Sequence, residues 1–265
     1  MNGRVLIIAG SDSGGGAGIQ ADIKTVTMLG GYASTAVTCV TAQNTLGVSD
    51  IHSIPPKMVY EQIKSVLEDI GTDVIKTGML YSAEIIKAVD RALEDFQYTG
   101  DLIVDPVMVA TSGAQLLNHD GIALYKELLL PRATLVTPNV PELETLTGRT
   151  IVSEEDLITA AEALLLAGTK AVVAKGGHLQ EELDIVRNFY ISQDSRFSFE
   201  ADRLPSRNTH GTGCTLASAL AVSLAQEMPL YEACERANNF VSRAIEQAPN
   251  LGKGAGPMGH AQARG

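Results

Sequence analysis

Short apolar segments alternate with longer amphipathic stretches along most of the chain. Each apolar segment ends at a polar, Gly or Pro cluster, a pattern typical of strands that are buried on both faces. We expect such strands at Arg4–Ala9, Thr35–Thr41, Asp73–Lys76, Asp101–Val104, Thr134–Thr137 and Ala171–Ala174.

The stretches between these segments carry apolar residues at helical spacing. Residues 57–70 and 82–95 each place their apolar positions on one helical face. Ser153, with Asp156 three residues later, is typical of a helix start, and Gly168 is typical of the position just after a helix end. Alternating strands and helices with short connections predict an α/β fold, in which helices cover both faces of a mostly parallel central sheet.

The pattern changes after Lys175. Residues 185–192 and 196–200 are predicted to form a β-hairpin, and 211–226 and 229–246 are predicted helices. No linker rich in Pro, Gly or Ser interrupts the chain between 20 and 250. We therefore expect a single domain over residues 1–265, in which the glycine-rich segment 251–265 is a flexible tail.

Composition narrows the possible classes of protein. The chain is 45% hydrophobic and 19% charged, which favours a folded protein over a disordered one. A net charge of −11 argues against a nucleic-acid partner, which requires a basic surface. No apolar run reaches the ~18 residues of a membrane span, and the N-terminal run Val5–Ala9 is too short for a signal peptide. We expect a cytoplasmic protein that has no membrane partner and whose three cysteines are reduced.

A glycine-rich turn, residues 10–18, follows the first predicted strand and precedes a helix. Such a turn brings backbone N–H groups close to a ligand. It lacks the lysine of a P-loop, and the next strand ends in Gln43 and Asn44 rather than in the acid of a dinucleotide site. A ligand-contacting turn remains, and glycines that serve only tight packing are the alternative.

A second glycine-rich segment, Asn208–Thr215, opens a helix of small residues. Free N–H groups and the positive end of the helix dipole meet there, which predicts an anion hole. The same position is expected to lower the pKa of the Cys214 thiol; the alternative is a buried structural cysteine. Cys39 and Cys234 are expected in the core.

Several polar residues follow directly after predicted strands, where open α/β sheets bind ligands. Asp105 and Glu142 are hard oxygen ligands suited to Mg²⁺, although each is also a plausible turn or cap residue. The histidines lack the spacing of a zinc site. His178 and His210 are expected to line the site, and His52, His119 and His260 are expected on the surface.

These motifs together resemble a known superfamily. Asn208–Cys214 resembles the C-terminal signature of the ribokinase-like small-molecule kinases, which usually carry Asp where this chain has Cys214. That cysteine, together with Ala9–Asp22 and Thr41-Ala42-Gln43-Asn44-Thr45, resembles the hydroxymethylpyrimidine/phosphomethylpyrimidine kinases of thiamine biosynthesis. Asp105-Pro106-Val107-Met108, Thr137-Pro138-Asn139-x-x-Glu142 and Lys175-Gly176-Gly177-His178 match that family in order and spacing. The resemblance covers about Val5 to Asn250.

The resemblance implies a ribokinase-like three-layer sandwich and two successive ATP-dependent phosphorylations, of the hydroxymethyl group and then of the monophosphate. It implies Mg²⁺, a homodimer, and a substrate flap at Met108–Leu117. The pyrimidine site it implies comprises Gly10, Asp22, Gln43, Met79 and Val107. Asp105 and Glu142 fall at the metal, Asn139 and Lys175 at the nucleotide, and Gly211, Thr212, Gly213 and Cys214 at the transfer centre, where Cys214 is expected to act as a base.

Two other functions stay open. Pyridoxal kinases share the fold and much of the site, but those related to this family often carry a flap cysteine, which is lacking around Ala110. The other alternative is a non-catalytic regulator that binds a pyrimidine or a nucleotide. An intact set of Asp105, Asn139, Glu142 and the glycine hole favours an enzyme over this regulator.

Overall fold

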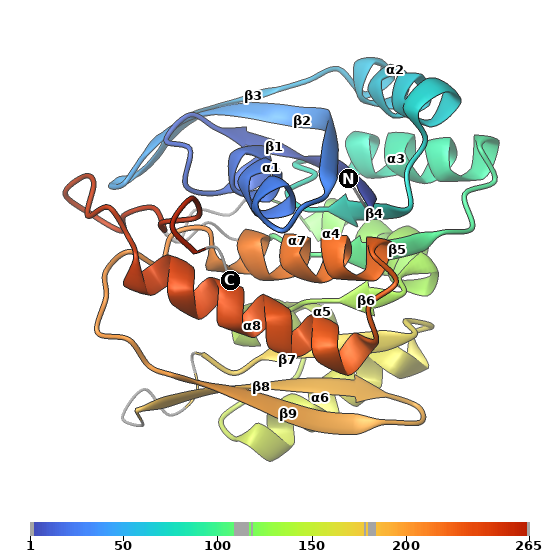
Figure 1. Ribbon diagram of the computed structural model, residues 1–265. Coiled ribbons are helices and arrows are strands. Elements are labelled where there is room, and N and C mark those ends of the chain that lie inside the picture. The colour runs from blue at the N-terminus through green and yellow to red at the C-terminus, as the bar shows by residue number, and fades with distance from the viewer. Residues whose placement is uncertain (1–2, 109–116, 118, 178, 180–183, 264–265) are drawn as a thin grey trace.

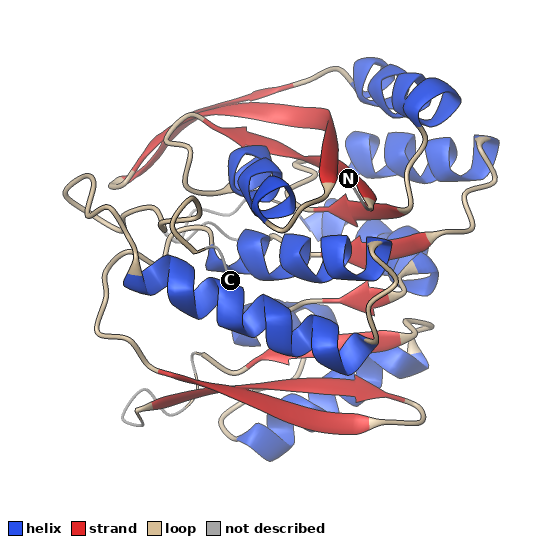
Figure 2. Ribbon diagram, in the orientation of Figure 1, coloured by secondary structure: helices blue, strands red, loops and turns tan. Residues whose placement is uncertain are grey.

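One β-sheet runs through the molecule, and helices cover both of its faces (Figures 1 and 2). The computed structural model describes residues 3–108, 117, 119–177, 179 and 184–263. Within these residues the strands are β1 (Arg4–Asp12), β2 (Tyr32–Asn44), β3 (Gly47–Ser53), β4 (Val74–Thr77), β5 (Asp101–Val104), β6 (Leu135–Val136), β7 (Ala171–Lys175), β8 (Ile185–Ser192) and β9 (Arg196–Asp202). The α-helices are α1 (Gly18–Met28), α2 (Pro56–Ser65), α3 (Ala83–Asp95), α4 (His119–Leu124), α5 (Val140–Thr147), α6 (Glu154–Leu166), α7 (Thr212–Ala225) and α8 (Leu230–Glu246).

The strand order in the described part of the chain is β3-β2-β1-β4-β5-β6-β7-β8-β9. The strands from β2 to β7 pair in parallel along this order, whereas β3, β8 and β9 are added antiparallel at the two edges. The predicted α/β fold with a mostly parallel sheet is therefore confirmed. Because parallel strands end at the same edge, the segments after β1, β4, β5 and β7 all meet there.

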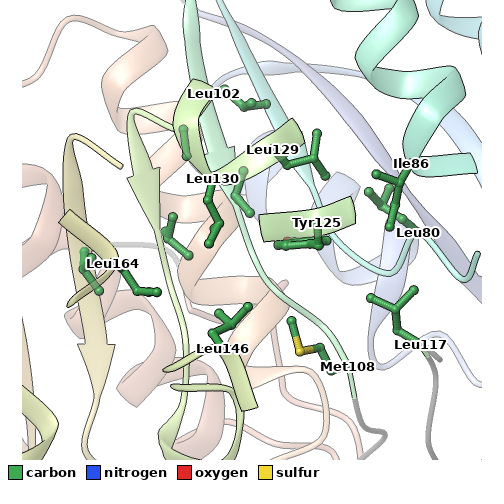
Figure 3. Close-up of a cluster of buried hydrophobic side chains, with 14 of the residues drawn as sticks. Leu80, Ile86, Leu102, Met108, Leu117, Tyr125, Leu129, Leu130, Leu146 and Leu164 are labelled. Carbon is green, nitrogen blue, oxygen red and sulfur yellow. The ribbon is translucent and has the colours of Figure 1, made fainter. Parts of the chain in front are cut away.

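Strand β1 shows why both faces are covered. Leu6 and Ile8 pack into the core formed with α2 to α6, part of which Figure 3 shows, and Val5 and Ile7 pack into the core formed with α1, α7 and α8. Successive side chains of a strand point to opposite faces, so an entirely apolar strand needs a helical layer on each side.

Most predicted elements are found within a few residues of their expected bounds. The predicted helix over 57–70 is divided, because α2 continues as a π-helical segment, Val66–Ile70. Another π-helical segment (Tyr125–Leu129) and a 3₁₀ turn (Leu130–Arg132) follow α4. Strand β3 was not predicted, because it is an exposed edge strand with a polar sequence. It pairs with an extension of β2 that reaches Asn44.

The expectation of a flexible tail is wrong for residues 251–263, because this segment packs against the rest of the protein. Met258, His260 and Ala263 are buried, and the imidazole Nε2 of His260 lies 2.9 Å from Thr215 Oγ1 in α7. The backbone N–H of His210 donates to the Gly256 carbonyl. The expected surface position of His260 is therefore wrong, since this segment packs against α8 and the loop before α7.

Candidate active site

A cavity of about 660 Å³ opens at the edge where the parallel strands end. It is lined by residues from the ends of β1, β4, β5 and β7 and from the first turns of α5 and α7. The structure brings into this one cavity the following residues singled out from the sequence: Gly10, Gln43, Met79, Asp105, Val107, Asn139, Glu142, Lys175, Gly211, Thr212, Gly213 and Cys214. Asp22 is the exception, and it lies behind the cavity wall.

The glycine-rich turn after β1 is folded around the carboxylate of Asp12. Its oxygens accept hydrogen bonds from the N–H groups of Gly14 (2.7 Å), Gly16 (2.9 Å) and Ala17 (2.8 Å). The Cα of Gly10 faces the Cys39 thiol so closely that a Cβ would lie 2.7 Å from its sulfur. Packing therefore requires some of these glycines, and the turn also lines the cavity, so the two interpretations of this turn are compatible.

The second glycine segment packs directly on the first. Gly211, the residue before α7, has a φ of +88°, and a Cβ there would overlap the carbonyl group of Gly16. A glycine is needed both for the left-handed backbone and for this close approach. Thr212, Gly213 and Cys214 form the first turn of α7. The Thr212 N–H donates to the Thr209 carbonyl at 3.3 Å, and the N–H groups of Gly213 and Cys214 have no partner from a preceding helical turn.

The predicted lowering of the Cys214 pKa is wrong. Burial raises the pKa of this thiol to about 12, and the nearby ammonium of Lys76 opposes that shift without reversing it. Cys214 is half-buried and lines the cavity, and removal from water disfavours the thiolate more than the charge of Lys76 favours it. Cys39 and Cys234 are buried, as expected.

Asp22 belongs to a cluster that we call the closed cluster: Asp22, Lys76 and Ser218. Lys76 Nζ lies 3.0 Å from both carboxylate oxygens of Asp22, and Ser218 Oγ donates to Oδ1 at 2.7 Å. All three residues are fully buried. Burial lowers the pKa of Lys76, but the negative charges of Asp22 and Asp105 raise it by more, so its pKa lies above the ordinary value. Lys76 is therefore charged at neutral pH and forms an ion pair with Asp22.

A second group, which we call the open cluster, comprises Asp105, Glu142 and Lys175. Lys175 Nζ lies 3.3 Å from Asp105 Oδ1 and 3.8 Å from Glu142 Oε2, and Thr137 Oγ1 donates to Asp105 Oδ1 at 3.2 Å. Asp105 Oδ2 is buried and has no hydrogen-bond partner among the described residues. The side chain of Lys175 remains 15% exposed, so this cluster can take up a ligand.

Glu142 and Asn139 form the capping box of α5. The Asn139 side chain accepts from the Glu142 N–H at 2.9 Å, and Glu142 Oε2 accepts from the Asn139 N–H at 2.8 Å. The alternative role of Glu142 as a cap residue is thus observed, although Glu142 also faces the cavity. Burial raises the pKa of its carboxyl to about 7, against the opposing charge of Lys175.

The sequence analysis missed Lys76 as a residue of this site. A lysine inside the otherwise apolar strand Val74–Thr77 is the signal that was available, because a buried ammonium requires an acidic partner. His210 lines the cavity as expected, whereas His52 is exposed. The predicted flap falls largely on 109–116 and the His178 prediction on residue 178, both outside the described residues; the surface expectation for the His119 side chain is likewise not described.

Residues 12–259 match the sequence model of the family described as phosphomethylpyrimidine kinase. The chain belongs to this family. A Bacillus subtilis hydroxymethylpyrimidine/phosphomethylpyrimidine kinase is 45% identical over 97% of this chain and 94% of its own length. The predicted family is therefore confirmed.

Two further relatives are a thiamine biosynthesis protein and a solved pyridoxal kinase. The thiamine biosynthesis bifunctional protein ThiED of Geobacter sulfurreducens is 50% identical over 97% of this chain, which spans about half (52%) of that protein's length. The structure of Staphylococcus aureus pyridoxal kinase in complex with AMP-PCP and pyridoxal superimposes with a TM-score of 0.88 at 33% identity, covering 99% of this chain and 95% of the other. The solved pyridoxal kinase structures confirm the predicted ribokinase-like fold, and the kinase relatives confirm the predicted phosphotransferase class.

The structure also bears on the expectations about a membrane and a metal ion. No helix in the described ranges is long and apolar enough to cross a membrane. Those ranges also contain no group of three or more His, Cys, Asp or Glu side chains that could hold a metal. A metal at the open cluster would therefore take further ligands from water or from phosphate oxygens, as Mg²⁺ commonly does.

Proposed function

We propose that this protein transfers the γ-phosphoryl group of ATP to the hydroxymethyl group of 4-amino-5-hydroxymethyl-2-methylpyrimidine, and then transfers a second phosphoryl group to the monophosphate. The observation that carries the proposal is a single cavity that joins Gln43, the glycine hole at 211–214 and the open cluster. The Gln43 amide can form a pair of hydrogen bonds with the edge of an aminopyrimidine. The glycine hole and the open cluster are suited to bind and stabilise a phosphoryl group during its transfer.

The protein acts mainly by positioning and by charge stabilisation. Phosphoryl transfer passes through a loose transition state, in which negative charge spreads over the equatorial oxygens of the transferred group. The N–H groups at the start of α7 are fixed by the Gly211–Gly16 contact, so they need no rearrangement to meet that charge. Lys175 adds a positive charge at the same side of the cavity.

The open cluster fits a magnesium ion. Asp105 Oδ2 is a buried carboxylate oxygen without a hydrogen-bond partner among the described residues, and the Glu142 carboxylate shares Lys175 with it. Asp105 and Glu142 would hold Mg²⁺ directly or through water, and the ion would neutralise charge on the triphosphate. Lys175 orients the Asp105 carboxylate, and Thr137 supports it from behind.

Cys214 takes a smaller role here than the one expected from the sequence. A thiol with a pKa near 12 is protonated at neutral pH, so the free enzyme offers no thiolate base. A loose transition state develops little charge on the attacking oxygen early, so the hydroxyl proton can leave late. In this proposal Cys214 lines the transfer centre in the first turn of α7 and does not take the proton.

The proposal includes a cytoplasmic homodimer. Leu46 (69% exposed) and Val40 (45% exposed) leave apolar surface at the β2–β3 edge of the sheet, which supports a second copy there. Sedimentation velocity of the purified chain would test it: a dimer is expected, and a monomer at micromolar concentration would contradict this part.

The experiment that tests the function is an ATP-consumption assay with Mg²⁺ and separate candidate substrates, followed by ³¹P NMR of the products. We expect the hydroxymethylpyrimidine to give a monophosphate and then a diphosphate. Turnover of pyridoxal without turnover of the pyrimidine would establish the alternative that the solved relative suggests. If neither compound causes ATP to be consumed, the regulator is favoured. A monophosphate that is never converted to the diphosphate would contradict the second step.

A further inference from the structure

His210 belongs to the second glycine-rich segment and contacts one residue near the end of β1 and one near the end of β2. Its Nε2 is 3.0 Å from Asp12 Oδ2 and 3.1 Å from the Gln43 amide atom placed as nitrogen. The Gln43 amide atom placed as oxygen is 3.2 Å from Thr41 Oγ1, which also lies 3.1 Å from the Ser11 carbonyl oxygen. All five of these residues line the cavity.

The first of these contacts fixes the proton on His210. Asp12 accepts three backbone N–H groups, and although burial raises its pKa, the hydrogen bonds from His210 and those N–H groups lower it below the ordinary value. A carboxylate can only accept, so Nε2 of His210 must carry the hydrogen that lies between them. A ring nitrogen that carries a hydrogen cannot accept one from the amide of Gln43.

The Thr41 hydroxyl leads to the same conclusion independently. It has one hydrogen, and both the Ser11 carbonyl and the atom placed as Gln43 oxygen are acceptors. One of the two contacts would therefore lack a hydrogen. Turning the amide by 180° replaces the donor–donor contact at His210 by an amide oxygen, which shares the Nε2 hydrogen with the Asp12 carboxylate. The amide nitrogen then donates to Thr41 Oγ1, and the Thr41 hydrogen goes to the Ser11 carbonyl. Amide oxygen and nitrogen are assigned from just such networks.

We propose that His210 is a positioning residue that fixes the Gln43 amide with its oxygen toward His210 and its nitrogen toward Thr41, and so sets which pyrimidine the cavity accepts and which way it lies. This inference rests on the proposed function. The two contacts use one lone pair of the oxygen and one hydrogen of the nitrogen. One acceptor and one donor, in a fixed order, remain for the substrate.

That order determines how the ring lies. The free amide oxygen accepts from the 4-amino group, and the free N–H donates to ring nitrogen N3, as a glutamine reads adenine. The hydroxymethyl carbon C5 is bonded to C4, so it lies on the His210 side, next to the glycine hole that begins at Gly211. The opposite amide orientation would turn the 2-methyl group toward the transfer centre.

A substrate pair with reversed hydrogen bonding tests this role. The 4-oxo analogue, 5-hydroxymethyl-2-methylpyrimidin-4-one, presents an acceptor at C4 and a donor at N3. We expect wild type to prefer the amino compound by roughly 5- to 150-fold in kcat/KM. His210→Gln keeps an N–H donor at the position of Nε2, whereas His210→Met has the same length and no donor. The ratio should persist in His210→Gln and fall at least fivefold in His210→Met, with the KM for ATP unchanged in both.

A wild-type ratio in His210→Met would overturn the inference, and so would an equal loss of the ratio in both variants. A merely structural role would lower both rates together and leave the ratio unmoved. Gln43→Leu, which cannot hydrogen-bond to the pyrimidine edge, gives the reference value of the ratio when this recognition is lost.

A second measurement needs no substrate. At pH 8, long-range ¹H–¹⁵N spectra of the His210 ring should show the hydrogen on Nε2. A hydrogen on Nδ1 alone would overturn the inference even in an active enzyme. If wild type phosphorylates neither pyrimidine, the proposed function fails, and with it the substrate consequence, while this spectrum separately decides the amide orientation.

Discussion

The closed and the open cluster both place a lysine beside carboxylates at the same cavity, but they differ in how much of their hydrogen-bonding capacity the protein itself uses. In the closed cluster, Lys76 is fully buried and both oxygens of Asp22 are occupied by Lys76 and Ser218. In the open cluster, Lys175 is partly exposed and Asp105 keeps one oxygen without a hydrogen-bond partner among the described residues. A buried ion pair whose hydrogen-bonding capacity is used has a structural role, whereas unused capacity that faces a cavity points to chemistry.

The two clusters also adjoin each other. Lys76 Nζ lies 4.0 Å from Asp105 Oδ2, so the closed cluster presents a fixed positive charge behind the open one. Asp22 therefore affects the site through Lys76 rather than by touching the substrate. Separating these roles requires changes on each side, with stability and activity measured together.

The largest effect is expected from Lys76→Met, which leaves the Asp22 carboxylate buried and unpaired. The free energy of unfolding should fall by about 3–5 kcal/mol, measured by urea denaturation. Lys76→Met combined with Asp22→Asn removes both charges and keeps an acceptor for Ser218, so it should recover most of the loss. A loss below about 1 kcal/mol in the single variant would show that the pair is not buried as a charged unit.

Lys175→Met is expected to separate activity from stability. Its ammonium is partly exposed and it faces the cavity, so unfolding free energy should fall less than in Lys76→Met. The kcat should fall roughly 10²- to 10³-fold, because a charge that meets the transferring group is lost. Initial rates at saturating ATP, beside urea denaturation, measure both, and Lys175→Arg is the charge-retaining control. A stability loss equal to that of Lys76→Met would remove the distinction between the clusters.

Glu142 predicts a pH dependence of stability. Its pKa is about 7 in the folded protein and 4.5 in the absence of burial, so the folded state binds its proton more tightly. The stability that this gives is present below about pH 4.5 and is lost as the pH rises through about 7. Between pH 5 and 8, without metal, wild type should lose about 1–3 kcal/mol of unfolding free energy relative to Glu142→Gln. Parallel curves for the two proteins would contradict a raised pKa.

The smallest effect is expected at Cys214. Because burial raises its pKa to about 12, iodoacetamide at pH 7 should modify it far more slowly than an exposed thiol. Cys214→Ala should lose less than about tenfold in kcat, that is, less than about 1.4 kcal/mol of transition-state stabilisation. Rapid alkylation that bound pyrimidine prevents, with a large loss in Cys214→Ala, would restore the role of a thiolate base.

The sequence predicts the open cluster better than the closed one, for a physical reason. Asp105 and Glu142 follow strands and Lys175 ends one, and parallel strands bring their ends to one edge whatever their exact register. Asp22 and Lys76 meet only because α1 packs on β1 and α7 with Asp22 turned toward Lys76 of β4, which depends on helix rotation and packing. No local pattern specifies that contact.

Two other differences have the same origin. The helix-start argument for Cys214 considered the local dipole and not the burial that the whole fold imposes. The glycines of the C-terminal segment suggested flexibility, yet a Cβ at Gly254 would overlap the Thr45 carbonyl and one at Gly256 the Asn208 side chain. Glycine there allows close packing between distant segments, which sequence alone does not distinguish from a mobile tail.

The most direct test of the account is the Mg²⁺ dependence of pyrimidine phosphorylation in wild type, Asp105→Asn and Asp22→Asn. If the open cluster holds the metal, Asp105→Asn should raise the Mg²⁺ concentration for half-maximal rate by about 10- to 100-fold. Asp22→Asn, which acts on the site only through Lys76, should shift that concentration much less while lowering stability. An unaltered Mg²⁺ requirement in Asp105→Asn, or an equal shift in both variants, would contradict the assignment of the chemistry to the open cluster.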